Sequence, residues 1–593
     1  MIISGDNKVL NAFTAIAIAT ITLLTAYSHS DSALHTHHKT LSHNKTPSHI
    51  MVTSTHTAFV GRNINPNHKA PLINLVHGAL QYGLYASRNQ SIATNALPDF
   101  SHAGYMGGGI AVPSYTSIPI REILKPMDGD DLPQIQNAIA RVAKQEPDSR
   151  GIRGAILLTA GHYQISDTLV IDTSGIVLRG EGQGKHGTRI IATTTHPDER
   201  ESVIELKNRK QKPARTKSKL LLATHRKQSK ITDNYVPVGA TSIHIDSTDD
   251  YHVGDEISIV RTPNATWVGK NGVNTAHFGW DPLTYAIAFT RKVTAIKGKT
   301  LIMNIPLVDA IDAQFGGGYV ERINNTPRVQ QMGVENLSVQ TLYRNKVTDL
   351  NRAFFGITLA GVENSWLRDL TVVFASHGYN ITDGSRFNTA QDVAYLDPNF
   401  DVRGGRNYGF IIHNGEMNLF QRCYGRKGRH TFVTGSRVSG PNVYLDCTSI
   451  EADNDSGPHH RWATGTLYDN TQGYQLHVQN RKNSGTGHGW AGAQNMFWNT
   501  DHATNIVEAP PHAMNWAFGI RGKLNNGKWV NEPNGLIKSL GKPVVPRSLY
   551  LQQLQDRLGP EAVNNITIEA QRRGEIWTLL KQWRGEYRLS DRL

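Results

Sequence analysis

The sequence contains little cysteine and none of the short motifs that mark several common enzyme classes. Its 593 residues include only Cys423 and Cys447, so at most one disulfide can form within the chain. It has no glycine-rich phosphate loop, no His-Glu-x-x-His zinc helix and no Gly-x-Ser-x-Gly nucleophile elbow. These absences count against the nucleotide-binding, zinc-protease and serine-hydrolase classes that use those motifs.

Long hydrophobic runs are also scarce, and the clearest one lies near the start. Lys8 is followed by an apolar run from Ala12 to Ala26 that ends in small residues. This pattern predicts a secretory signal over residues 1–27, with an uncleaved membrane anchor as the alternative. We therefore expect a secreted or periplasmic protein without stable membrane insertion after the signal is removed.

Acidic residues are absent from residues 206–230, although that stretch holds ten positive charges between Lys207 and Lys230. The formal net charge of +13 is thus mostly local. Such a loop attracts an acidic polysaccharide, a phosphate-bearing surface or nucleic acid, and a solvated loop without a partner is the alternative. Our interpretation favours the polysaccharide and no nucleic acid.

Composition indicates a large folded protein with a polar N-terminal segment. At 38% hydrophobic and 19% charged residues the chain can form a large core, but it is too long for one ordinary domain unless the architecture repeats. Residues 28–114 are interpreted as a His/Ser-rich linker and N-terminal extension, with regular order beginning near Tyr115.

A short amphipathic helix followed by glycine-punctuated strands opens the ordered part. Asp131 is the expected N-cap, and Ile135, Ile139 and Val142 recur at helical spacing. The segments that follow are short and β-branched, with glycine between them: 154–158, 161–165, 168–171 and 175–180.

Three of these motifs carry a resemblance to a known superfamily: Asp128-Gly-Asp-Asp, Gly161-His-Tyr-Gln-Ile and Leu178-Arg-Gly-Glu-Gly. As a set they resemble the pectate-lyase-like right-handed parallel β-helix superfamily of polysaccharide lyases and related glycosidases. The resemblance implies an all-β fold, a pectin-lyase-like solenoid whose N-terminal cap helix closes the open end of the coil. We place the coil at residues 115–530.

Additional segments are expected around this coil. Residues 236–310 alternate as a β-rich insertion with a hairpin of 291–296 and 300–303, and residues 546–593 form a helical C-terminal tail that caps the coil end. The Gly-Val-Glu-Asn at 333–336 and 361–364 indicates a repeat, and 383–406 is expected to be a polar loop. The two cysteines are expected to stack one rung apart.

Histidines recur beside glycine or proline in five segments, 24 to 53 residues apart, which is one or two turns of a solenoid. The coil should then stack them along one wall. The segments are those of His377, His430, His459 with His460, His488 and His512.

This histidine row is the predicted functional site. Cleavage of a uronate polymer by β-elimination requires cations that neutralise the carboxylate, a neutral base and a proton donor. The predicted catalytic residues are His460 or His430 as base, Arg461 with Arg426 as second choice for the carboxylate, and Tyr468 as donor. Predicted substrate-binding residues are His459, His488, Arg426, Lys427, Trp462, Trp490 and Arg481.

An acidic run supports different chemistry. Glu451, Asp453 and Asp455 alternate along one segment and suit Ca²⁺ binding or the two carboxylates of a glycosidase. The resemblance bears on this, since some lyases of the superfamily use Ca²⁺ with an arginine base and its hydrolases use clustered aspartates. The sequence therefore predicts a monomeric enzyme on an acidic polysaccharide, first a lyase, then a glycoside hydrolase, with a non-catalytic glycan-binding adhesin as the third hypothesis.

Overall fold

The computed structural model describes residues 70–195, 201–208, 227–273, 279–323 and 328–592. The predicted signal over 1–27, the histidine-rich part of the linker and most of the basic stretch 206–230 lie outside these residues. Within the described part, no helix is both long enough and apolar enough to cross a membrane.

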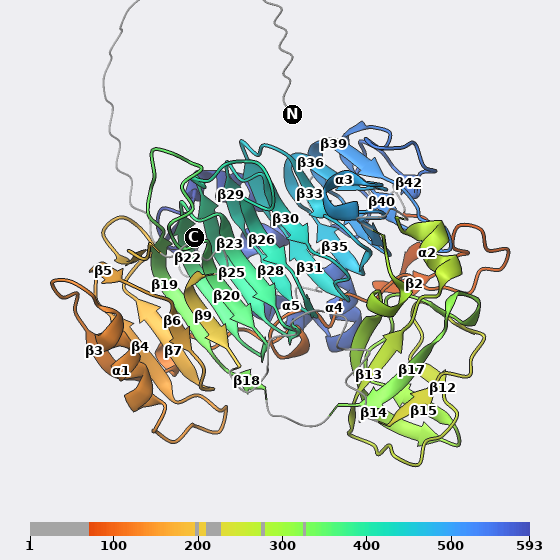
Figure 1. The fold of residues 1–593 in the computed structure, drawn as a ribbon, viewed down its shortest axis with the longest axis horizontal. Helices are drawn as coiled ribbons and strands as arrows, with labels where there is room; N and C mark the ends of the chain where they lie inside the picture. Colours follow the sequence, from red (N-terminus) through yellow and green to blue (C-terminus); the bar gives the residue numbers. More distant parts are fainter. Residues whose placement is uncertain (1–69, 196–200, 209–226, 274–278, 324–327, 593) are drawn as a thin grey trace, which may run out of the picture. The chain divides into compact units, whose positions relative to one another are not determined.

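Most of the chain winds into a coil of parallel strands that form three ladders, visible as the stacked arrows of Figure 1. The first ladder is β3 (Ile120–Leu124), β4 (Gly154–Leu158), β7 (Ile176–Gly180), β19 (Gly333–Gln340), β22 (Trp366–Val373), β25 (Thr389–Leu396), β28 (Leu419–Gln421), β31 (Asn442–Leu445), β35 (Thr466–Asp469), β38 (Met496–Trp498), β40 (Trp516–Phe518) and β42 (Leu536–Lys538).

The strands β19, β22 and β25 belong to both the first and the second ladder, because their last residues pair in the second. The other strands of the second ladder are β5 (Gly161–Ile165), β8 (Thr188–Ala192), β29 (Tyr424–Arg426), β32 (Thr448–Ile450), β36 (Gln472–Val478), β39 (Asp501–Val507) and β41 (Arg521–Leu524). The third ladder is β6 (Leu169–Ile171), β9 (Ser202–Lys207), β20 (Phe355–Ala360), β23 (His377–Thr382), β26 (Tyr408–Ile412), β30 (His430–Thr434) and β33 (Asp455–Pro458), which pairs with β36.

Most turns of the coil contribute a strand to each ladder, so the predicted right-handed parallel β-helix is confirmed as the fold. Its interior is filled by columns of equivalent side chains, such as Phe420, Tyr444 and Tyr468, whose rings stack at 5.4 and 5.2 Å. Since parallel strands lie about 4.8 Å apart, each ring covers the next. The two cysteines follow the same rule, because Tyr424 pairs with Thr448 and places Cys423 beside Cys447, and both are free thiols.

Polar columns mark the corners of the coil. Asn388, Asn418 and Asn442 donate their side-chain amides to one another, at 3.0 and 3.3 Å, so their buried groups are satisfied within one column. A second corner bends the chain between the first and second ladders through left-handed residues. They are Asn336, Asp369, Asp392, Arg422 and Asp446, with φ between 51° and 58°.

Short strands form small ladders at the other turns of the coil: β18 (Val329–Gln330), β21 (Val362–Glu363), β24 (Ser385–Arg386) and β27 (Gly415–Glu416), and separately β34 (Ala463–Thr464) with β37 (Gly492–Ala493). The observed strands correct two expectations from the sequence. The Gly-Val-Glu-Asn segments are not equivalent, because Gly333 pairs with Trp366 in the first ladder while Val362 belongs to a turn strand. The expected loop 383–406 is irregular only from Asp397, since Thr389–Leu396 forms the buried strand β25.

The predicted cap helix is confirmed as α1 (Leu132–Val142), which buries Ile135, Ile139 and Val142 against the coil. Asp131 occupies the N-cap position without capping the helix. Its carboxylate accepts hydrogen bonds from the backbone N–H of Met127 and of Gln164, both at 2.9 Å, and so ties the helix start to β5.

Regular order begins before the expected Tyr115. Residues 70–114 include the hairpin β1 (Ile73–Val76) and β2 (Ala79–Tyr82) and lie against the coil and the C-terminal helices. Tyr85 contacts Trp516 edge to face at 5.1 Å, and Phe100 N–H donates to Gln553 at 2.9 Å. Residues 70–114 are therefore an N-terminal extension packed on the coil and not a linker, because apolar side chains such as Ile73, Leu97 and Phe100 are buried.

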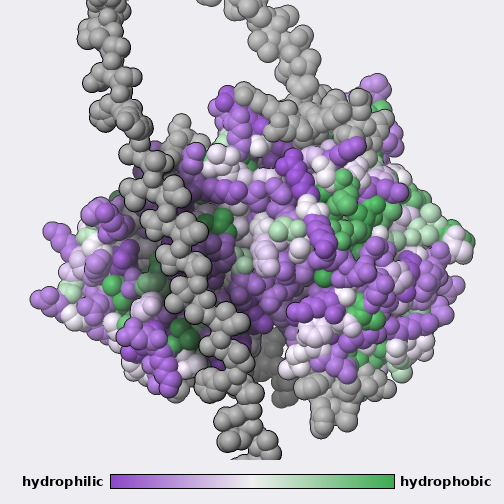
Figure 2. Space-filling model, turned by 90° about the horizontal axis from the view of Figure 1, so that it is seen from above, coloured by the Kyte–Doolittle hydropathy of each residue, from purple (hydrophilic) through white to green (hydrophobic). Residues whose placement is uncertain are grey.

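The C-terminal helices are α4 (Leu549–Leu558), α5 (Pro560–Ile566), α6 (Glu569–Arg573) and α7 (Ile576–Trp583). They flank the coil instead of closing its end. α4 and α5 share a core with strands of the first ladder, and α7 packs on β32. The face of the molecule in Figure 2 is mostly hydrophilic, with apolar residues gathered in a few patches.

The predicted insertion is a six-stranded antiparallel sheet between β9 and β19, wider than 236–310. Its order is β10 (Gln228–Lys230), β17 (Gly318–Arg322), β13 (Glu256–Arg261), β14 (Ile287–Lys297), β15 (Thr300–Met303) and β12 (Ser242–His244). The pair β11 (Tyr235–Val236) and β16 (Ile311–Asp312) and the helix α2 (Ala265–Asn271) complete it. The expected hairpin is confirmed as β14 and β15, in which Lys297 pairs with Thr300.

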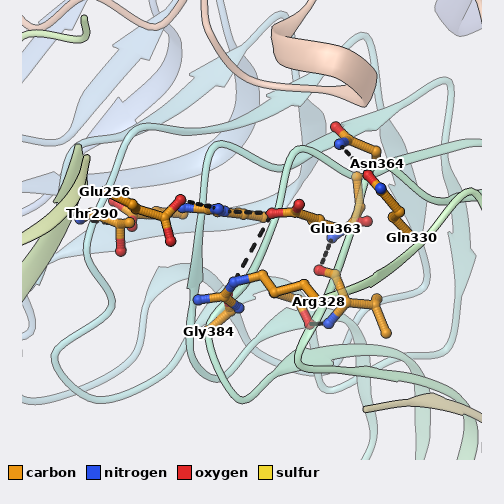
Figure 3. A network of polar contacts seen from close by, with 12 residues as sticks. Glu256, Thr290, Arg328, Gln330, Glu363, Asn364 and Gly384 are labelled. Atoms are coloured by element: carbon orange, nitrogen blue, oxygen red, sulfur yellow. Dashed lines mark hydrogen bonds and ion pairs between the residues drawn. The ribbon is translucent and has the colours of Figure 1, made fainter. Parts of the chain in front are cut away.

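Buried charges join the insertion to the coil. Arg386 of β24 contacts Glu256 of the insertion and donates to Glu363 at 2.8 Å, and Figure 3 shows Glu256, Glu363 and Arg328 in one polar network. Nearby, Arg291 donates to Glu416 at 3.0 Å. Each charge lost from such a network leaves its partner buried and unpaired.

We predict that Arg386→Met lowers the free energy of unfolding of the insertion by roughly 3–5 kcal/mol. The substitution leaves two partly buried carboxylates without the arginine that pairs with them. Tryptophan fluorescence during chemical denaturation measures this, since Trp267 and Trp280 lie in the insertion core. The matched control is Arg403→Met, which breaks an exposed pair with Asp401 and should leave the free energy of unfolding nearly unchanged. Equal effects of the two substitutions would contradict the role of the network.

Asp469 joins the C-terminal tail to the coil, and it predicts a pH effect. Its carboxyl group accepts from Ser548 Oγ at 2.7 Å and Tyr550 N–H at 2.8 Å, and burial raises its pKa to about 7. The folded state therefore holds the proton of Asp469 more tightly than the unfolded state does. This preference stabilises the folded state at low pH, and the stabilisation is lost as the pH rises through 7. We expect Asp469→Asn to become more stable to heat relative to the wild type as the pH rises from about 4 to about 7, with a constant difference above that range. A difference that does not change between these two pH values would contradict this.

Candidate functional site

The structure contains a polar groove of about 620 Å³ on the coil, and we call it the groove from here on. It lies over the turn before β33, the strands β36 and β39 and the chain that follows β41. Its lining residues are Arg429, Asp453, Asn454, Asp455, Tyr474, Gln475, His477, Gln479, Arg481, Ser484, Thr504, Ile506, Asn525, Asn526, Lys528 and Trp529.

Strand alternation explains how one face of β36 enters the groove. Gln475 and His477 line it, while Leu476 and Val478 are buried in the interior of the coil. Gly457, with φ of 120°, brings β33 close to β36: a Cβ atom there would lie 2.1 Å from the carbonyl oxygen of His477. The close contact places Asp455 beside His477.

Asp455 is a buried carboxylate held by two histidines. His430 donates its Nδ1–H to the backbone oxygen of Asp455 at 2.6 Å and lies 3.4 Å from the carboxylate, and His477 Nδ1 lies 3.9 Å from it. Burial acts to raise the pKa of Asp455, but His430, Arg481 and His477 outweigh it, so the pKa lies below its usual value. Asp455 is therefore an ionised group beside two imidazoles.

His477 is a neutral imidazole at the groove. Burial lowers its pKa, Asp455 partly opposes this effect, and Arg481 and Lys528 lower it further. Its Nε2 atom is buried and has no hydrogen-bond partner in the described part of the chain. A neutral ring with an unused lone pair near neutral pH is what a general base requires.

The sequence interpretation missed His477. The signal was present in the alternation of Gln475, His477 and Gln479, which places the three side chains on one face of a strand. His477 has no neighbouring glycine or proline, so it did not share the pattern of the five segments.

Three cations and two aromatic rings complete the groove. Arg429, Arg481 and Lys528 line it, and Tyr474 and Trp529 are each 45% exposed. Lys528 lies over the Trp529 ring at 5.3 Å. Exposed rings beside cations suit a chain of charged sugars, since rings stack on sugar faces and cations pair with carboxylates.

Glu508 fixes the segment that carries Lys528 and Trp529. Its carboxylate accepts from the backbone N–H of Asn480 at 2.7 Å and of Glu532 at 3.1 Å. Burial raises its pKa to about 7. Glu508 therefore links the two segments that supply Arg481 and Lys528, and it does not itself line the groove.

The predicted histidine row exists, but it is buried. Phe355, His377, Tyr408 and His430 are register partners on successive strands of the third ladder. Beyond them the ring of His459 lies 4.6 Å from that of His430 and 5.2 Å from that of His488. His377 is 2% and His430 1% exposed, so these imidazoles do not form the open wall that was expected to grip a polymer. Burial lowers the pKa of His430 to about 4.

Two of the five histidine segments differ from the prediction. His512 is not part of the row and contacts Phe315 of the insertion, with ring centroids 4.6 Å apart. His460 and Arg461 lie at the outer end of the row: the His460 ring is 5.0 Å from that of His488, and Arg461 donates to the Thr486 side chain at 2.7 Å. Neither of the two lines the groove.

Three predicted aromatic site residues are structural. Tyr468 is fully buried in the interior column of the coil and cannot donate a proton to a polymer outside it. Trp462 and Trp490 belong to the core of the insertion, where Trp462 Nε1–H donates to Asp309 at 3.1 Å. Their sequence pattern is typical of buried residues as well as of sugar platforms, and burial decides between the two.

The remaining predicted residues divide between the groove and the corner beside it. Arg426 pairs with Asp397, whose oxygen lies 2.9 Å from Nε, and Lys427 lies 4.0 Å from Glu451. Arg426, Lys427 and Glu451 therefore neutralise neighbours and do not line the groove, whereas Arg481, Asp453 and Asp455 do.

The structure does not bring Glu451, Asp453 and Asp455 together as metal ligands. In the described ranges no three His, Cys, Asp or Glu side chains are grouped so as to hold a metal ion. The segment turns at Glu451, whose φ is 51°, so the expected alternation of carboxylates on one side does not occur.

Comparisons with known proteins identify related folds at low identity. No family model and no curated protein matches the sequence. Among solved structures, the alginate lyase of Paenibacillus sp. str. FPU-7 is 11% identical, covering 70% of this chain and 99% of the lyase with a TM-score of 0.34. The polygalacturonase of Erwinia carotovora ssp. carotovora is 10% identical, covering 76% and 100% with a TM-score of 0.32.

A third match is the tailspike gp49 of Pseudomonas phage LKA1, which is 13% identical, covering 66% of this chain and 68% of the tailspike with a TM-score of 0.31. The chain spans about two thirds of the length of the phage tailspikes that it matches. The predicted resemblance is confirmed for the fold. The chain is a parallel β-helix by its own strand registers, and the chemistry of the groove depends on its own residues.

Proposed function

We propose that the protein cleaves an acidic, uronate-containing polysaccharide by β-elimination in the groove. The observation that carries the proposal is the combination of a neutral imidazole, His477, with the cations Arg429, Arg481 and Lys528 on one lining. Elimination needs both: cations lower the pKa of the carbon acid beside the carboxylate, and a neutral base removes its proton.

In the elimination step His477 takes the proton from the carbon next to the substrate carboxylate, and the electron pair of that C–H bond forms a carbon–carbon double bond. The bond from the neighbouring carbon to the glycosidic oxygen breaks, and that oxygen takes a proton from the hydroxyl of Tyr474, which also lines the groove. The Asp455 carboxylate, 3.9 Å from His477 Nδ1, stabilises the imidazolium that forms.

Glycoside hydrolysis is the second candidate, because Asp453 and Asp455 both line the groove. A glycosidase requires one carboxylic acid that is protonated near neutral pH. The lowered pKa of Asp455 makes it unsuitable as that acid, and Glu508, whose pKa is raised to about 7, does not line the groove. This argument favours elimination over hydrolysis. Binding without cleavage is the third hypothesis, since the same cations and rings suit it.

We expect the protein to release products with an unsaturated sugar end from at least one uronate polymer. A panel of pectate, alginate, glucuronan and hyaluronan, followed by ultraviolet absorbance and by a reducing-end assay, separates the three hypotheses. Reducing ends without ultraviolet absorbance would mean hydrolysis, and binding without either signal would mean an adhesin. Repeating the panel with a chelator and with added Ca²⁺ tests whether the reaction depends on Ca²⁺.

His477→Gln should lower kcat about 10²–10⁴-fold with little change in KM, because it removes the base and keeps a polar side chain of similar size. His502→Gln is the matched control, since His502 is also buried and lies one rung away, where it contacts Thr471 instead of the groove. Thermal melting of both variants verifies folding. Unchanged kcat in a folded His477→Gln variant would exclude His477 as the base.

A further inference from the structure

Neither of the two arginines that line the groove, Arg429 and Arg481, has a carboxylate within ion-pair distance among the described residues. Arg426 and Arg422 each present the Nε and Nη2 edge of the guanidinium to an aspartate, Asp397 and Asp392. Arg481 is near enough to Asp455 to lower the pKa of that carboxyl group, but it forms no hydrogen bond with it in the described part of the structure. Its Nε–H is buried and without a hydrogen-bond partner there.

The opposite side of the same guanidinium is fully used by one residue. Arg481 Nη1 donates to the ring Nδ1 of His459 and to the backbone oxygen of His459, both at 2.9 Å. Because an arginine only donates, Nδ1 must carry the lone pair, which assigns the tautomer of His459. The proton of the neutral ring is therefore on Nε2.

The hydroxyl oxygen of Tyr408 accepts the hydrogen bond from this N–H group. This oxygen lies 3.2 Å from His459 Nε2, and both residues are buried, at 6% and 8% exposure. Burial lowers the pKa of His459 well below its usual value, and Arg481 lowers it further. The chain of donors thus runs from Arg481 to His459 and from His459 to Tyr408, with each ring nitrogen committed to one role.

We propose that the free Nε and Nη2 edge of Arg481 is the subsite for the substrate carboxylate, and that His459 and Tyr408 are positioning residues that aim this edge into the groove. The inference rests on the proposed function and adds to it one charged group and its two buried supports. A carboxylate accepts two parallel N–H bonds from this edge of an arginine, a geometry that lysine cannot reproduce. It also assigns a role to the inner end of the histidine row.

Uronate oligosaccharides are the probe, and the same oligosaccharides with reduced carboxyl groups are the control ligand. Affinity by calorimetry and KM and kcat by elimination are measured for Arg481→Lys, His459→Leu, His459→Asn and Tyr408→Phe. The asparagine oxygen can replace Nδ1 as the acceptor, whereas leucine removes it. His502→Leu is the matched control, since His502 is also buried, contacts Thr471, and has no contact with Arg481, His459 or Tyr408 in the described structure.

Arg481→Lys and His459→Leu should each weaken binding of the acidic oligosaccharides about tenfold or more and raise KM equally, with binding of the reduced forms unchanged. His459→Asn should restore most of the affinity, and His502→Leu should match the wild type. Tyr408→Phe should give a smaller loss, because it removes one hydrogen bond two residues away from the ligand.

Wild-type affinity in folded Arg481→Lys and His459→Leu variants would overturn the inference while elimination by the wild-type protein still supports the proposed function. Arg481-dependent binding without any unsaturated product would reject the lyase function and keep the carboxylate subsite. If the wild type binds acidic and reduced oligosaccharides equally, the subsite is overturned whichever reaction occurs. Thermal melting of each variant separates loss of folding from loss of binding.

Discussion

The vertical stacking of parallel strands in fixed register is the constraint on which this molecule depends. Each turn of the coil adds one residue to every column, so a side chain placed badly in one rung disturbs the rungs above and below. The same rule produces the amide column at Asn388, the ring column at Phe420 and the histidine row at His430. Structural and functional columns differ only in the face of the strand from which they project.

Burial decides what the charged and titratable residues can do. The coil and the insertion take arginines and carboxylates out of water in pairs, as at Arg386 and Glu363, so most cations are already neutralised. Histidines taken out of water in the same way remain neutral. The groove is the place where both tendencies meet, because three cations that form no ion pair among the described residues, Arg429, Arg481 and Lys528, line it together with a neutral imidazole at His477. That combination is unusual on a surface and supports chemistry on an acidic substrate.

The segments outside the coil shape the site without supplying its base. The insertion packs on the tryptophans that follow the histidine row, and the chain after β41 brings Lys528 and Trp529 over the strands. Glu508 ties that chain to the turn that carries Arg481. The groove is therefore built by contacts between distant parts of the sequence, which explains why a pattern within one segment did not reveal it.

The sequence by itself determined the coil, the cap helix, the β-rich insertion and the alignment of His377, His430 and His459, because strand length, helical spacing and repeat length are local properties. It also placed Arg481 and Asp455 among the candidates. Only the tertiary structure decided which of these residues reach solvent. Tyr468 and Trp462 face inward, Arg426 is paired, and His477 faces the groove, since burial and pairing depend on which turns and loops cover each rung.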